Sequence, residues 1–206
     1  MLEIVIAGGW LMLPILLCSV IAVAIILERF LALRSGRVMP SGIPAQVRLW
    51  AQQQELDAKH IDQLRRSSPL GRVLAAALAN RQRSREVIKE AVEDTGRHVV
   101  HELERFLNTL GTIAGITPLL GLLGTVVGMI KVFSAIMVHG VGDPGELAGG
   151  ISEALITTAA GLTVAIPSFF FYRYFRGLVR DHVMQMEQQA LVLMHTIEYG
   201  NRRRTR

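Results

Sequence analysis

Charge is missing from the longest apolar stretches of this sequence. Residues 4–27, 110–130 and 154–172 contain no Asp, Glu, Lys or Arg, although 19% of all 206 residues are charged. Each run is close to the roughly 20 residues that a helix needs to cross the hydrocarbon core. Half of all residues are hydrophobic, and the mean hydropathy is +0.37. We therefore expect an all-α integral membrane protein with three transmembrane helices.

Cysteine and positively charged leader residues are also scarce. Cys18 is the only cysteine, which excludes a disulfide within the chain. No Lys or Arg precedes Arg29, so the first run lacks the leader of a cleaved signal peptide and is expected to be retained. His98 and His101 lack the further ligands that a metal site needs, so we expect no metal, cofactor or catalytic residue.

Basic residues are absent from one side of the expected membrane. Arginines follow the first and third runs, whereas the charged residues of the connector at 138–150 are both acids, Asp143 and Glu146. Since Lys and Arg favour the cytoplasmic side, the N-terminus is expected outside and the C-terminus inside. This asymmetry accounts for the net charge of +5 and gives no argument for nucleic acid. The expected segments are transmembrane helix 1 (1–33), a cytoplasmic helical loop (34–106), transmembrane helix 2 (107–137), an outer connector (138–150), transmembrane helix 3 (151–175) and a cytoplasmic helical tail with a basic end (176–206).

Helical periodicity continues beyond two of the spans. Ile88, Val92, Val99 and Leu103 recur at steps of three to seven residues before the second span, with charged residues between them. A similar apolar face follows the third span. We therefore expect long cytoplasmic extensions of helices 2 and 3, the first of them running into the membrane without a break.

Small side chains gather on one face of the second and third helices when residues are placed at about 100° per step. Stripes of small residues allow another helix to approach closely. We expect a partner helix to pack on this face. Its residues are Thr117, Pro118, Gly121, Gly124, Gly128 and Gly161.

One acid, Glu153, begins the third span. It is either a residue that compensates the dipole at the helix N-terminus or the mouth of a polar pathway that Thr157, Thr158 and Thr125 continue. Threonine passes a hydrogen bond but holds no proton at physiological pH, and no Asp, Glu, His, Lys or Arg lies within the second and third runs. A proton pathway would therefore need a titratable group from another chain.

Two motifs resemble a known family. "TPLLGLLGTVVGMI" followed by "GISEALITTAAGLTVAIP" is similar to the signature helices of the MotA/TolQ/ExbB proton-channel family, in particular its ExbB and TolQ branch. The resemblance implies a pentamer in the bacterial inner membrane with a periplasmic N-terminus. It further implies lipid around the ring, an ExbD/TolR-type single-span partner carrying a transmembrane aspartate, and a TonB-like or TolA-like protein. Thr125, Thr158 and Glu153 match the family's pore residues.

The expected function is an ExbB-like subunit that couples the proton motive force to TonB-dependent uptake. A TolQ-like role in envelope maintenance and a non-conducting scaffold stay open as alternatives. An enzyme is not expected, because "GISEA" fails the G-x-S-x-G pattern and "GTVVGMIK" fails the phosphate-loop pattern.

Overall fold

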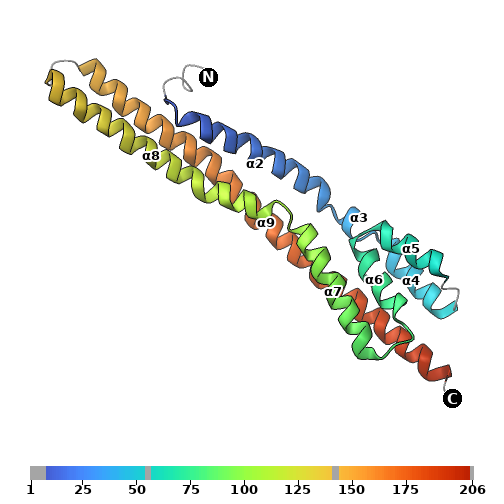
Figure 1. Cartoon of the computed structure of the whole chain (residues 1–206). Helices are drawn as coiled ribbons and strands as arrows, with labels where there is room; N and C mark the ends of the chain where they lie inside the picture. Colours follow the sequence, from blue (N-terminus) through green and yellow to red (C-terminus); the bar gives the residue numbers. More distant parts are fainter. Residues whose placement is uncertain (1–7, 54–56, 141–143, 205–206) are drawn as a thin grey trace. The chain divides into compact units, whose positions relative to one another are not determined.

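The computed structural model describes residues 8–53, 57–140 and 144–204 (Figure 1). Within these ranges the chain is helical, as predicted. The helices are α2 (Met12–Ala32), α3 (Ser35–Val38), α4 (Gly42–Gln53), α5 (Ala58–Ser67), α6 (Pro69–Ala79), α7 (Arg85–Leu103), α8 (Leu107–His139) and α9 (Pro144–Arg204). The chain divides into two compact units. These are a span unit, Met1–Glu28 with Phe106–Tyr174, and a loop unit, Arg29–Arg105 with Phe175–Arg206.

Three helices are long and apolar enough to cross a membrane, which confirms the three predicted spans. They lie in Met12–Ala32, Leu107–Val138 and Leu147–Ile197. The first begins later than predicted, because the chain turns at Gly9, whose φ is +69°. Its 21 residues still give about 32 Å of helix, enough to span. Residues 4–7 of the predicted span lie outside the described residues.

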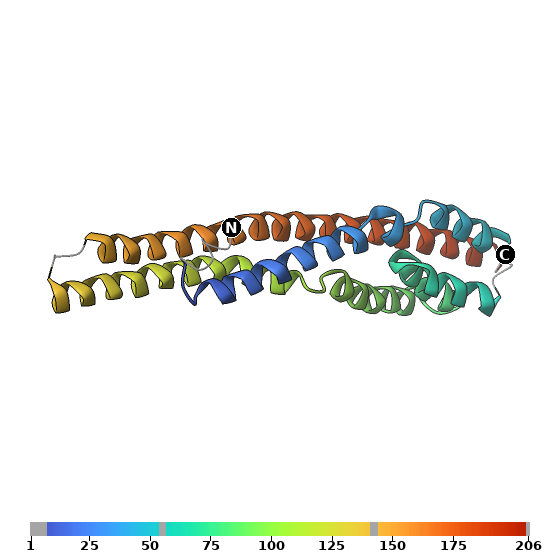
Figure 2. The same ribbon diagram turned by 90° about the horizontal axis from the view of Figure 1, so that it is seen from above.

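In the span unit, α8 and α9 lie side by side (Figures 1 and 2). Gly128 lies against Ala154 and Gly121 against Thr158, so the two helices run antiparallel. Small residues at these positions bring the two backbones close together, as is common between membrane helices.

The connector is shorter than predicted. α8 continues to His139 and α9 already begins at Pro144, so residues 140–143 separate them instead of 138–150. The prediction gave too much weight to Gly149 and Gly150, which lie inside α9. Helix propensity is a weak guide, and tertiary context overrides it.

The expected unbroken extension of helix 2 is wrong. α7 ends at Leu103, and Phe106 has a left-handed φ of 62° before α8 starts. Within the loop unit, Arg29 Nη1 donates a hydrogen bond of 3.0 Å to the Leu103 carbonyl oxygen. This side chain satisfies one of the carbonyls that a helix C-terminus leaves without a partner. The extension of helix 3, in contrast, is helical as predicted, because α9 continues to Arg204.

In the loop unit, α6 packs against α5 and α7 and buries Leu70, Leu74 and Leu78. Its N-terminus is fixed by Ser68, whose buried hydroxyl accepts a hydrogen bond of 3.0 Å from the Gly71 N–H. Side chains of this kind satisfy donors that have no partner within the helix.

We expect Ser68→Ala to lower the free energy of unfolding of the loop unit by about 1 kcal/mol, because the Gly71 N–H loses its acceptor. Ser84→Ala is the matched control, since Ser84 precedes α7 without such a hydrogen bond. Thermal denaturation of the purified protein measures the difference. Equal stability of the two variants would contradict this role of Ser68.

Candidate functional site

Glu153 lies well inside α9. The helix begins at Pro144, so Glu153 is in its third turn instead of the first. The field of a helix dipole falls off within the first turn. The structure therefore contradicts the interpretation of Glu153 as an N-terminal capping residue, and the error follows from the misplaced start of the helix.

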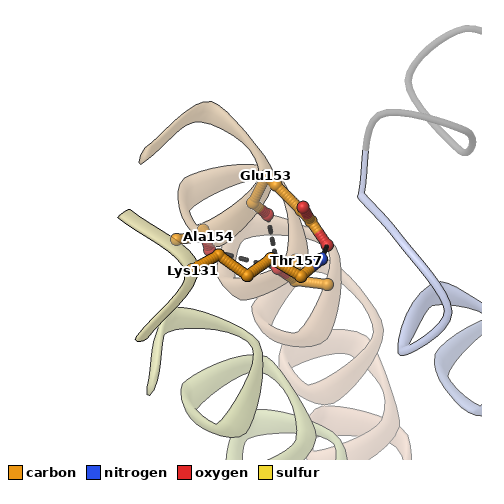
Figure 3. A network of polar contacts seen from close by, with 4 residues as sticks. All are labelled: Lys131, Glu153, Ala154 and Thr157. Carbon is orange, nitrogen blue, oxygen red and sulfur yellow. Dashed lines mark hydrogen bonds and ion pairs between the residues drawn. The ribbon is translucent and has the colours of Figure 1, made fainter. Parts of the chain in front are cut away.

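The partner of Glu153 is a lysine on the neighbouring helix. Lys131 Nζ of α8 lies 2.6 Å from Glu153 Oε1, and Figure 3 shows the two side chains meeting between α8 and α9. The Lys131 side chain is 52% exposed and that of Glu153 is 22% exposed. Lys131 lies within the predicted second span (107–137) but was not among the predicted site residues, because only the uncharged run that ends at residue 130 was searched for polar groups. Spacing could have found it, since Lys131 continues the face of Gly124 and Gly128 at three- and four-residue steps.

A glycine lies on the other side of the carboxylate. A Cβ built at Gly9 would overlap Glu153 Oε1, and the φ of +69° at Gly9 is one that side chains disfavour. The turn before α2 thus passes directly over Glu153 in the span unit. Neither the position nor the role of Gly9 was predicted.

The three candidate threonines donate their hydrogen bonds to backbone oxygens. Thr125 Oγ1 donates to the Leu122 carbonyl at 2.6 Å, and Thr157 Oγ1 donates to the Glu153 carbonyl at 2.6 Å. These two hydroxyls therefore bond the backbone of their own helices.

Thr158 behaves differently from the other two. Its Oγ1 donates across the hairpin to the Gly121 carbonyl of α8 at 2.8 Å. Within the described residues, these bonds connect no threonine hydroxyl to the Glu153 carboxylate. The structure therefore shows the predicted pathway residues on one hairpin, in an arrangement where their hydrogen bonds do not form a continuous chain.

The predicted partner-helix face is occupied within the chain itself. A Cβ on Gly124 would meet Thr157 at 2.5 Å, and one on Gly161 would meet the Thr117 carbonyl oxygen at 2.5 Å. Thr117 is fully buried, whereas Pro118 is half-buried within α8. The sequence analysis expected another chain at this face, but in the structure its neighbour is α9. Periodicity shows that a face is smooth but does not tell which helix covers it.

No group of three metal-ligating side chains is found among residues 8–53, 57–140 and 144–204. His98 and His101 are both exposed on α7. The polar groups that the structure brings together on the α8–α9 hairpin include the Lys131–Glu153 ion pair and the threonine hydroxyls.

The fold and this site define a helical membrane protein with polar groups along a hairpin of two apolar helices. A family model described as the MotA/TolQ/ExbB proton channel family matches residues 65–188. The chain belongs to this family, as its motifs indicated. Its members are channel and transport proteins, so the chain is not an enzyme.

Three relatives show how far the similarity extends. The chain is 37% identical over 193 residues to the biopolymer transport protein ExbB-like 1 of Synechocystis sp., covering 90% of this chain and 73% of that protein. It is 31% identical to ExbB-like 3 of the same organism, covering 90% of each. With the biopolymer transport protein exbB1 of Vibrio cholerae it shares 35% identity over 133 residues, 64% of this chain and 55% of that protein.

Proposed function

We propose that this chain is the ring-forming subunit of a proton channel in the bacterial inner membrane. Five copies would form the ring, and an ExbD/TolR-type partner would supply a transmembrane aspartate. Proton flow would then drive a TonB-like protein in transport across the outer membrane. The observation that carries this proposal is the composition of the hairpin. Its apolar runs contain hydroxyls but no Asp, Glu, His, Lys or Arg, so conduction needs such a group from another chain.

The proposed topology follows the basic residues. The N-terminus and the connector would lie in the periplasm, and the segments 34–106 and 176–206 in the cytoplasm. Glu153 and Lys131 would then lie towards the periplasmic end of the hairpin. Lipid would cover the exposed apolar side chains, which include Leu119, Val126 and Ile166.

The proposed proton pathway runs from Glu153 past Thr157 and Thr158 to Thr125, with the partner's aspartate completing it. Thr158 supports this pathway because it is the hydroxyl that bonds across the two helices. The glycine face packs α8 on α9, so the partner helix would have to contact the hairpin beside that face, where Thr125 is partly exposed.

Proton uptake into vesicles tests the proposed function. The chain is reconstituted with and without a co-expressed single-span partner, and the interior pH is followed after a pH difference is imposed. We expect uptake only when the partner is present. An assembled complex with no partner-dependent uptake would favour the non-conducting scaffold. The ExbB names of the relatives favour an ExbB-like role over a TolQ-like one.

We expect Thr158→Val to lower partner-dependent proton uptake by roughly threefold to tenfold, as a change of about 0.6–1.4 kcal/mol would do. Valine keeps the shape of threonine but removes the hydroxyl. The matched control is Thr163→Val, because Thr163 is exposed on the same helix and bonds its own backbone. If both Thr158→Val and Thr125→Val take up protons at the native rate, neither hydroxyl belongs to the pathway.

A further inference from the structure

The carboxylate of Glu153 is enclosed by two parts of the span unit that are far apart in sequence. Lys131 Nζ approaches Oε1 from α8 at 2.6 Å, and the backbone of Gly9 lies against the same oxygen from the turn before α2. Lys131 and Gly9 therefore both lie next to the same carboxylate oxygen, Glu153 Oε1. We call Lys131, Glu153 and Gly9 the carboxylate clasp.

The hydrogen bonds of the candidate threonines Thr157 and Thr158 do not include the Glu153 carboxylate. Thr157 lies one turn further along α9, but its hydroxyl donates to the backbone carbonyls of Glu153 and Ala154 (Figure 3). Thr158 donates to Gly121 instead. Since a hydroxyl has one proton to donate, none of these bonds reaches the carboxylate. The carboxylate is directed towards Lys131.

Lys131 and Glu153 form an ion pair between α8 and α9. An ammonium group that donates to a carboxylate gives a short, charge-assisted hydrogen bond. Transfer of a proton to this carboxylate would remove the attraction between the two charges, so proton binding by Glu153 and separation of the pair are coupled. The exposed side chain of Lys131 has room to move away, because lysine is a point charge on a flexible stem.

We propose that Lys131 is a positioning residue that holds Glu153 in a closed state, and that Gly9 is the residue that leaves space for it. This inference rests on the proposed function, in which Glu153 belongs to the proton pathway. Opening of the clasp would precede proton uptake by Glu153. Lys131 therefore restrains the acid and is not itself part of the pathway.

Zero-length cross-linking tests the geometry of the clasp without any measurement of conduction. A water-soluble carbodiimide is applied to the full chain with its partner in membranes, and tryptic peptides are analysed by mass spectrometry. It activates the carboxylate, the lysine amine attacks it, and an amide forms with loss of one water to the carbodiimide. We expect an amide between Lys131 and Glu153. The internal control is Lys89–Glu93 on α7, whose atoms lie 3.6 Å apart and which is more exposed.

Gly9→Ala supplies the matched variant for this cross-link. The added methyl group would overlap Glu153 Oε1, so we expect the Lys131–Glu153 amide to fall several-fold while the Lys89–Glu93 amide is unchanged. If the native chain forms the Lys89–Glu93 control amide but no Lys131–Glu153 amide, the proposal is overturned. Equal yields of the Lys131–Glu153 amide in the native chain and in Gly9→Ala would overturn the role of Gly9.

Proton uptake tests the restraint. We expect Lys131→Gln to raise partner-dependent uptake several-fold, whereas Lys131→Arg, which keeps the charge, should remain near the native rate. Reduced uptake in an assembled Lys131→Gln complex would overturn the proposal, since Lys131 would then be needed for conduction. If the native complex itself takes up no protons, the proposed function fails, and the cross-link still decides whether the clasp exists.

Discussion

Replacing Glu153 with glutamine is expected to lower the rate of partner-dependent proton uptake by about tenfold or more. A tenfold lower rate corresponds to an increase of about 1.4 kcal/mol in the free-energy barrier to proton transfer. Glutamine has nearly the same shape but neither carries a negative charge nor binds a proton. The hairpin should stay assembled, because Lys131 is half exposed and water can solvate its charge. Vesicle uptake at a fixed pH difference measures the effect.

Two further variants show whether charge or shape matters at this position. Glu153→Asp keeps the charge and should retain more uptake than Glu153→Gln. Glu93→Gln is the matched control, because it also removes the acid of a Lys–Glu pair, one whose two side chains are exposed on α7. If Glu153→Gln and Glu153→Asp behave alike and both complexes are unstable, Glu153 serves packing and does not belong to the pathway.

The second large effect, a loss of thermal stability, is expected from Gly161→Ala. A Cβ at this position would lie 2.5 Å from the Thr117 carbonyl oxygen and 3.2 Å from Gly121 Cα. Both are backbone atoms, so neither can turn aside as a flexible side chain would, and the two helices have to separate. Overpacking of this kind costs about 1–3 kcal/mol, and we expect the Tm to fall by roughly 3–10 °C.

Gly149→Ala is the control for this substitution, because Gly149 lies on the same helix with nothing within 4 Å of a built Cβ. Heating the purified complex and following its loss by gel filtration gives both Tm values. If Gly161→Ala has the same Tm as the native protein, α8 and α9 do not approach each other as closely as the structure shows. A fall of the same size in both variants would indicate a general loss on adding a methyl group to α9.

The three spans could be predicted because long uncharged runs have few alternatives to a membrane helix. The break between α7 and α8 could not be predicted. Val99, Leu103, Phe106 and Leu110 keep the apolar period through it, and a change of φ at one residue leaves no mark on that period. At the break, the Leu103 carbonyl accepts a hydrogen bond from Arg29, which lies 74 positions earlier in the sequence.

The candidate site shows a similar division. Glu153 and the threonines could be found as polar groups in apolar surroundings. Lys131 was missed because only the uncharged run up to residue 130 was searched for site residues, although the predicted span and α8 both continue past it. Gly9 could not have been found, because its importance comes from a contact across 144 positions of sequence, its numerical distance from Glu153. Pairings of this kind are set by tertiary structure.

The left-handed residue Phe106 gives the two helices of the hairpin unequal ends. The hydrogen-bond ladder of α8 starts there, whereas α9 passes through Tyr172, which lies against Gly111 near the start of α8. A helix terminus frays before a helix interior does. Local opening of the hairpin therefore starts on α8. We expect amide hydrogens in the first turn of α8 to exchange with solvent sooner than those of α9 opposite them.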